Sequence, residues 1–269
     1  MSSFILRDQL DTTPGIGAPG ARPLDQALFA ARKVPQVTLI FWIIKVLSTG
    51  MGETSSDYLV RTLDPIIAVI LGGVCFAAAL ILQLVVRRYV PWIYWLAVVM
   101  VAIFGTMVAD VLHIVFHVPY VVSSIFFAVA LTIVFVAWYA SEKTLSIHTI
   151  NTRRRELFYW TTVITTFALG TAVGDMTATT LHLGYFASGI LFAVLFAVPA
   201  VGYWLFDMNE IFAFWFAYIM TRPLGASFAD WLGRPQSLGG VGIGTGQVSL
   251  ALAIVIAILV SYLTVTGKE

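Results

Sequence analysis

Long apolar runs separated by short polar segments dominate this sequence. Eight of them are long enough to cross a bilayer as helices, since one span takes about 20 residues. They cover approximately residues 37–57, 64–86, 92–114, 118–140, 157–180, 184–206, 209–231 and 246–265. The runs are apolar on all faces, whereas a membrane-barrel strand alternates polar and apolar residues over about ten positions. The sequence therefore predicts an all-α polytopic membrane protein with eight transmembrane helices.

Composition excludes several other classes of protein. Only 11% of the residues are charged, against roughly 25% in soluble domains. The formal net charge of +1 leaves no basic surface for nucleic acid. Cys75 is the single cysteine and lies within an apolar run, which excludes a disulfide framework and a cysteine-based metal site.

The positions of the basic residues predict the orientation. Residues 1–36 are interpreted as a flexible tail without the apolar core of a signal peptide, and residues 37–266 as a single transmembrane domain. Eleven of the fifteen Lys and Arg residues lie in the tail, in the loops after the second and fourth spans, or at the carboxyl end. Because such residues favour the cytoplasmic side, we expect an inner-membrane protein with both termini in the cytoplasm.

The chain also contains an internal repeat. The segments FWIIKVLSTGMGETSSD, YWLAVVMVAIFGTMVAD, YWTTVITTFALGTAVGD and FWFAYIMTRPLGASFAD align without a gap. Each has an aromatic residue before Trp, then Gly ten residues and Asp fifteen residues after that Trp. The repeated residues are Trp42, Trp95, Trp160 and Trp215; Gly52, Gly105, Gly170 and Gly225; and Asp57, Asp110, Asp175 and Asp230.

Each repeat is predicted to be a helical hairpin, in which a motif helix is followed by a plain apolar return helix. The hairpins cover about residues 37–88, 90–141, 155–207 and 209–266. Since all four have the same orientation, we expect a pseudo-fourfold or pseudo-twofold arrangement about the membrane normal.

This pattern resembles a bacterial family of multi-pass inner-membrane proteins built of four tandem two-span repeats with a characteristic tryptophan. The resemblance covers residues 37–266. The family's repeat is of unknown function, so the resemblance implies an architecture and no activity.

The repeated aspartates are the main candidate site. A carboxylate within a span costs about 3 kcal/mol or more and usually faces protein or water. Four equivalent aspartates would converge in a symmetric bundle, and Glu53 lies one turn before Asp57 on the same face. Lys45 and Arg222 are the candidate counter-charges within spans. We expect an acidic cavity that opens outward; the alternative is that each Asp ties helix ends together.

Other repeated residues have two interpretations each. Trp would be an interfacial anchor or would pack around a central axis. The small residues would allow close helix packing, or would permit a locally opened helix near Pro223. The hydroxyl groups of Thr49, Thr106 and Thr171 would supply neutral ligands for a cation.

Histidines on the outward side predict a transition-metal site. Asp110, His113 and His117 follow the spacing i, i+3, i+7, and His182 follows Asp175 by seven residues. Imidazole and carboxylate together suit Zn, Mn, Fe, Ni or Co. The alternative is that these histidines are merely interfacial and solvated.

The sequence as a whole favours a transporter or channel for a small cation, with a divalent metal ion or proton coupling as variants. The first alternative is a non-transporting scaffold or sensor, and the second is an intramembrane enzyme acting on a lipid. No enzyme motif is present, so we expect no enzymatic activity and no bound cofactor other than a divalent metal ion. The expected partners are the lipid bilayer and a small cation. The sequence does not decide whether the protein forms a homo-oligomer.

Overall fold

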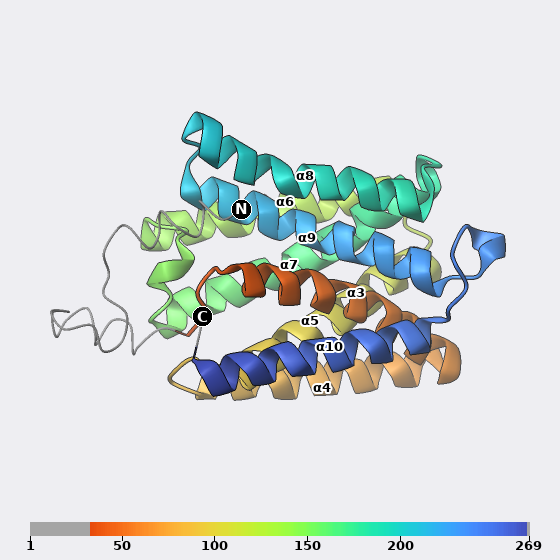
Figure 1. The fold of residues 1–269 in the computed structure, drawn as a ribbon, viewed down its shortest axis with the longest axis horizontal. Coiled ribbons are helices and arrows are strands. Elements are labelled where there is room, and N and C mark those ends of the chain that lie inside the picture. The colour runs from red at the N-terminus through yellow and green to blue at the C-terminus, as the bar shows by residue number, and fades with distance from the viewer. Residues whose placement is uncertain (1–32, 268–269) are drawn as a thin grey trace, which may run out of the picture.

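The computed structural model of the protein describes residues 33–267, so most of the expected tail lies outside the described residues. Eight long α-helices make up this part of the chain, and they run along its long axis (Figure 1). They are α3 (Leu39–Thr62), α4 (Pro65–Val85), α5 (Pro91–Asp110), α6 (Tyr120–Glu142), α7 (Arg153–Asp175), α8 (Gly184–Phe206), α9 (Glu210–Gly233) and α10 (Thr245–Thr266). Each apolar run is helical, which confirms the all-helical prediction.

Six of these helices are long and apolar enough to cross a membrane, counting residues 33–267 only. They are α4, α5, α6, α7, α8 and α10. The other two, α3 and α9, are interrupted by charged side chains, among them Lys45, Glu53 and Asp57 in α3 and Arg222 and Asp230 in α9. The protein is therefore a multi-pass membrane protein, and the charged side chains within α3 and α9 need shelter from lipid.

The helix boundaries follow from local chemistry. The side chains of Thr38, Asp64, Thr152 and Asn209 accept hydrogen bonds from backbone N–H groups at the start of α3, α4, α7 and α9. In contrast, α9 continues as one helix through Pro223. The alternative of a locally opened helix there is wrong.

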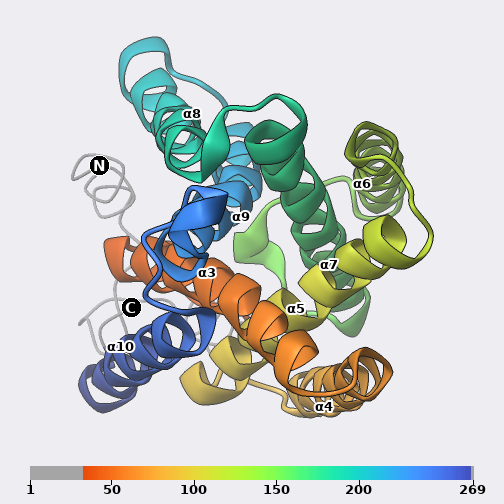
Figure 2. The ribbon, with the colours of Figure 1, turned by 90° about the vertical axis from the view of Figure 1, so that its right-hand side faces the viewer.

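The four helices that carry the repeat motifs lie at the centre of the bundle (Figure 2). Each packs against two of the others, in the order α3, α5, α7, α9 and back to α3. The return helices lie outside this group. Each packs chiefly on the inner helix of the following repeat, α4 on α5, α6 on α7 and α8 on α9, while α10 packs on α3. The hairpins therefore interlock, and the last helix of the chain covers the first.

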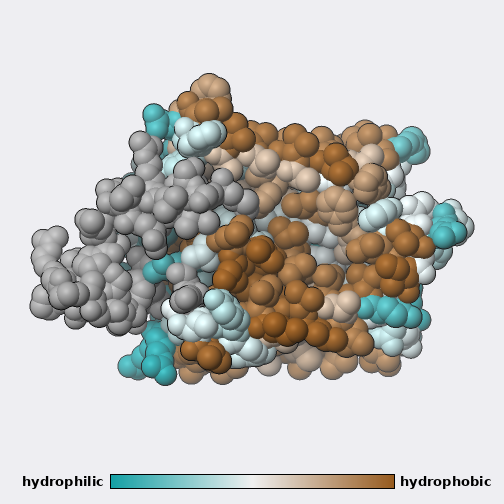
Figure 3. Space-filling view, in the orientation of Figure 1, coloured by the Kyte–Doolittle hydropathy of each residue, from teal (hydrophilic) through white to brown (hydrophobic). Residues whose placement is uncertain are grey.

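The outer surface is that of a membrane protein. Large apolar side chains are exposed along the return helices, including Ile66, Val74, Phe126, Val194 and Ile258. Figure 3 shows hydrophobic residues across the middle of one side of the bundle and hydrophilic residues toward both ends. An exposed apolar surface is unfavourable in water but not against the hydrocarbon of a bilayer. This surface therefore agrees with the prediction of a membrane protein.

An aromatic layer fills the core where the inner helices begin. The residue before each repeated Trp packs against the Trp of the next repeat. The ring-centroid distances are 5.6 Å for Phe41–Trp95, 5.7 Å for Tyr94–Trp160, 6.2 Å for Tyr159–Trp215 and 5.7 Å for Phe214–Trp42. All four tryptophans are buried. The interpretation of Trp as a lipid-facing interfacial anchor is therefore wrong, and the packing interpretation is right.

The repeated glycines mark close helix crossings. A Cβ atom on Gly52 would lie 2.4 Å from Ala102 Cβ, and one on Gly170 would lie 2.4 Å from Arg222 Cγ. At Gly225 the corresponding distance to Thr49 Oγ1 is 2.0 Å, and at Gly105 the distance to Phe167 Cβ is 3.1 Å. Each glycine thus faces the residue that lies three positions before the glycine of the next repeat. These contacts let the inner helices approach closely at four equivalent points.

Candidate functional site

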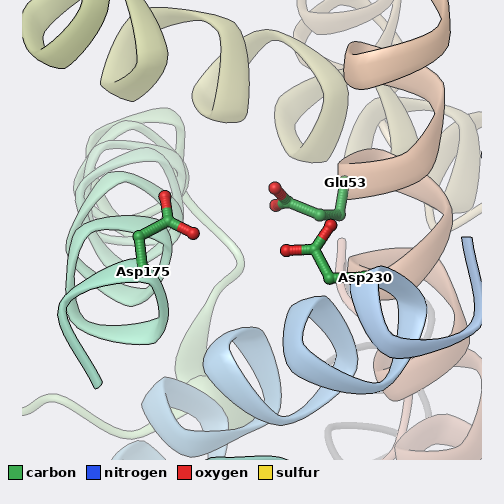
Figure 4. A group of neighbouring side chains, drawn as sticks. All are labelled: Glu53, Asp175 and Asp230. Atoms are coloured by element: carbon green, nitrogen blue, oxygen red, sulfur yellow. The ribbon is translucent and has the colours of Figure 1, made fainter. Parts of the chain in front are cut away.

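Acidic side chains from the C-terminal halves of three inner helices converge in space. The carboxylate oxygens of Glu53 (α3), Asp175 (α7) and Asp230 (α9) lie within 4.8 Å of one another. Figure 4 shows Asp175 facing the other two carboxylates. Glu53 and Asp230 are buried and Asp175 is partly exposed. Among the described residues this is the single group of three or more His, Cys, Asp or Glu side chains close enough to share a metal ion.

The two remaining repeated aspartates lie at the same end of the bundle, which we call the acidic end. Asp110 is within electrostatic range of Glu53, Asp57 and Asp230. Asp57 forms ion pairs with Arg61 at 3.2 Å and with Arg234 at 3.4 Å. Five carboxylates from four helices therefore gather in one region.

Arg234, directly after α9, joins two of these carboxylates. Its guanidinium donates to Asp230 at 2.9 Å and also contacts Asp57. Burial lowers the pKa of Arg234, but the neighbouring Asp230 and Asp57 raise it above its ordinary value, so the guanidinium stays charged. Arg234 is not among the site residues predicted from the sequence. The sequence does contain a pattern that predicts the pair with Asp230, since Arg234 follows Asp230 by four residues.

Arg222 occupies the centre of the bundle beneath the acidic end. Its side chain is 1% exposed and pairs with Glu53 at 2.7 Å. It also donates to the backbone carbonyl of Thr49 at 2.6 Å and to the hydroxyls of Thr171, at 2.8 Å, and Thr106. One side chain thus contacts the three other inner helices. Two of the three hydroxyls expected to bind a cation, those of Thr106 and Thr171, accept hydrogen bonds from Arg222 instead, and the hydroxyl of Thr49 donates to the carbonyl of Thr221.

Asp110 and Asp175 differ from the other three acids. Neither has an ion-pair partner within 4.0 Å among the described residues, whereas Glu53, Asp57 and Asp230 each have one. Both aspartates are the last residue of an α-helix, and a π-helical turn follows each one, over Val111–Val115 and Met176–Thr180. In the described part of the chain, two carboxylates thus lack a direct ion pair at a place where the helix geometry changes. π-helical turns occur frequently at functional sites.

Lys45 does not have the expected role of counter-charge. It is fully buried, and its side-chain nitrogen Nζ has no hydrogen-bond partner among residues 33–267. Nζ lies 4.1 Å from the ring centroid of Phe167 and 4.2 Å from that of Tyr218. The expectation that Lys45 is a counter-charge for the repeated acids is therefore wrong. The acidic residues of its own helix, Glu53 and Asp57, lie two or more turns further along α3.

The predicted histidine metal site is not assembled. The set Asp110, His113, His117 and His182 does not come together, because the helix widens into a π turn and ends before His117. His113 stacks on Tyr120 with a centroid distance of 3.5 Å, and its Nδ1 lies 2.9 Å from the Val118 carbonyl. His117 and His182 are exposed and have left-handed backbone conformations, with φ of 54° and 55°. They are equivalent residues that end the second and third motif helices.

A second buried charge pair lies at the opposite end of the bundle. Lys33 forms an ion pair with Glu156 of α7, and Gln83 of α4 donates to the same carboxylate at 3.2 Å. Lys33 also donates to the Leu84 carbonyl at 3.3 Å. Sequence analysis assigned Lys33 to a solvated tail and did not single out Glu156. No pattern pointed to this pair, because its members are 123 residues apart.

The family described as Repeat of Unknown Function (DUF347) matches the sequence in four consecutive segments, residues 40–89, 93–144, 158–208 and 213–269. The chain belongs to this family. The prediction of a four-repeat family is thereby confirmed. No curated protein and no solved structure matches the chain.

The four DUF347 repeats are not equivalent at the centre of the bundle. The residue after the repeated glycine is Glu53, Thr106, Thr171 or Ala226. Three of these four side chains meet at Arg222, which belongs to the fourth repeat. The four repeats therefore share one backbone arrangement. Differences between them at single equivalent positions create one asymmetric charged centre.

Proposed function

We propose that this protein is an integral membrane transporter for a small divalent cation, with the acidic end as its outward-facing binding site. The convergence of Glu53, Asp175 and Asp230 from three helices is the observation that carries the proposal. The nearby Asp57 and Asp110 add negative charge that Arg222 and Arg234 only partly balance. Uncompensated carboxylates within a membrane bundle are expensive and typically mark an ion path.

The proposal includes a membrane topology. All eight helices would span the bilayer as four hairpins, with pseudo-fourfold symmetry about the membrane normal. The cyclic contacts of α3, α5, α7 and α9 support this arrangement, as do the four equivalent glycine contacts. Both termini would be cytoplasmic in an inner membrane, because the loops at the tryptophan end carry most of the basic residues.

The ligand set favours a hard cation. Carboxylate oxygens suit Mn²⁺, Mg²⁺ and Ca²⁺, whereas Zn²⁺ and Ni²⁺ prefer sites that include imidazole. Since the histidines lie apart from the carboxylates, we narrow the proposed substrate to the first group.

A transporter is favoured over an open channel. Arg222 lies across the centre of the bundle, hydrogen-bonded to residues of three neighbouring helices. Beyond it lie the buried Lys45 and the aromatic layer. A cation leaving the acidic end would meet the fixed positive charge of Arg222 and then tightly packed side chains, so passage would need a conformational change.

The experiment is Mn²⁺ uptake into liposomes containing the purified protein. We expect uptake by the wild type and a loss of about tenfold or more in Asp175→Asn, since one ligand charge is removed. Asp64→Asn is the matched control, because Asp64 lies at the same end, caps α4 and can be replaced by Asn as a cap. Equal uptake by liposomes with and without protein, across Mn²⁺, Mg²⁺ and Ca²⁺, would contradict the proposal.

A scaffold or sensor is the second candidate. The observation that favours it is that Arg222 and Arg234 tie acids from different helices together, as purely structural pairs would. Under this reading all five acids stabilise the fold. Asp110 and Asp175, which have no ion-pair partner among the residues that the structure describes, separate the two candidates.

A further inference from the structure

Lys45 is a buried basic side chain that the proposed cation site does not use. It lies in α3, three residues after Trp42, and is 0% exposed. Its Nζ atom has no hydrogen-bond partner in the described part of the chain. At the equivalent position the other repeats carry Val98, Val163 and Tyr218. A lysine here is thus peculiar to the first repeat, and packing alone does not require it.

The surroundings of Lys45 hold a proton on its amine only loosely. Two aromatic ring faces, those of Phe167 and Tyr218, lie 4.1 and 4.2 Å from Nζ. Such contacts attract the ammonium form, whereas burial without an anionic partner disfavours it, so the two effects oppose each other. Arg222 is within electrostatic range and repels a second positive charge.

Within residues 33–267, no other group around Lys45 supplies a negative charge. From α9 it faces Arg222 and Tyr218, while α5 and α7 bring Tyr94 and Tyr159 to this end of the core, hydrogen-bonded to each other at 2.5 Å. The packed helices α4 and α10 contain no charged residue, and their Cys75 and Tyr262 are exposed. Glu53 lies eight residues further along α3, which corresponds to about 12 Å.

Arg222 connects Lys45 to the acidic end. Its guanidinium pairs with Glu53, one of the three converging carboxylates. A cation bound by Glu53, Asp175 and Asp230 competes with the guanidinium for the Glu53 carboxylate. The positive charge released from this pair then acts on Lys45. Loss of the cation restores the pair and lowers the repulsion at Lys45.

We propose that Lys45 is a proton-carrying site, and that protonation of its amine and binding of a divalent cation at the acidic end exclude each other. The amine takes one proton from water when the cation site is empty and returns it to water when a cation binds. Because one proton leaves when a divalent cation binds, the net charge of the bundle rises by less than the two charges of the cation. This inference rests on the proposed function, and it makes the transporter an exchanger of a divalent cation for protons.

The test measures protons released when Mn²⁺ binds to the full-length protein in detergent, with a pH indicator dye. Binding to clustered carboxylates also releases protons, so the result is the difference between variants. We expect Lys45→Val to release about one proton fewer per bound ion than the wild type. Val98→Ala is the matched control, because it alters packing at the equivalent position and keeps the lysine. It should release as many protons as the wild type.

A second variant separates charge from packing. Lys45→Arg places a permanent positive charge at this position, so we expect its Mn²⁺ affinity to fall by about tenfold. Lys45→Val should bind Mn²⁺ at least as tightly as the wild type. If Lys45 were only structural, both variants would bind Mn²⁺ more weakly than the wild type. That result would overturn the proposal.

The outcomes also separate this inference from the proposed function. In liposomes, Mn²⁺ uptake by the wild type should move protons outward, and uptake by Lys45→Val should proceed without that component. Uptake with identical proton movement in both proteins would overturn the role of Lys45 and leave the cation transporter standing. A wild type that neither binds nor transports Mn²⁺ would overturn the manganese site and this inference together.

Discussion

The Nη2 atom of Arg222 lies 2.7 Å from Oε2 of Glu53, across the contact between α9 and α3 in the centre of the bundle. Both side chains are almost completely buried. Removing either one leaves a charge in a region without water, and such a change costs about 3–5 kcal/mol. This pair is therefore the most sensitive point of the fold.

Arg222→Met should lower the free energy of unfolding by about 3–5 kcal/mol, measured in mixed micelles. Adding Glu53→Gln should recover a large part of the loss, because no unpaired charge remains. Arg61→Gln is the control: Arg61 pairs with Asp57 but is half exposed, so we expect less than about 1 kcal/mol. A double variant no more stable than Arg222→Met would show that the pair is not the cause.

Gly170→Ala should destabilise the protein by about 1–3 kcal/mol, because its Cβ would overlap Arg222 in the neighbouring helix. The matched control is Gly174→Ala, one turn further along α7. A Cβ there would lie 3.6 Å from Pro223, which is an ordinary contact. Thermal unfolding of the two variants in the same detergent compares them. Equal melting temperatures would contradict the close crossing at Gly170.

Asp175→Asn and Asp230→Asn should differ in stability. Asp230 is buried and paired with Arg234 at 2.9 Å, so losing its charge should cost about 1–3 kcal/mol. Asp175 has no such partner, so its replacement should change the free energy of unfolding by less than about 1 kcal/mol. Both variants should lose Mn²⁺ uptake. If Asp175→Asn unfolded as readily as Asp230→Asn while uptake persisted, the scaffold candidate would be preferred.

His117→Gly should leave Mn²⁺ uptake unchanged. The imidazole lies outside the carboxylate group, and glycine tolerates the left-handed backbone at φ 54°. The substitution should stabilise the protein by up to about 1 kcal/mol because the strained conformation no longer carries a side chain. The same is expected of His182→Gly, at φ 55°. A fall in uptake with either variant would restore the histidines to the metal site.

Most of the fold was predictable because membrane helices are determined locally. An apolar run of the right length must satisfy its own backbone hydrogen bonds, which leaves a helix as the simplest solution. The fourfold recurrence of Trp, Gly and Asp likewise pointed to equivalent hairpins before any contact was known. The histidine prediction failed because it assumed an ideal helix, and the chain instead forms a π turn after Asp110.

The sequence by itself determined the helices, the repeat and the presence of acids at equivalent positions. Only the tertiary structure decided which acids are neutralised. Arg222, Lys45 and Arg234 lie near the central axis of the bundle or at its acidic end, and their spacing in the sequence does not reveal their partners. Arg222 reaches Glu53 from 169 residues away, and Lys45 reaches no acid. The physical reason is that helix formation depends on neighbours in the chain, whereas the fate of a buried charge depends on side chains that only packing brings together.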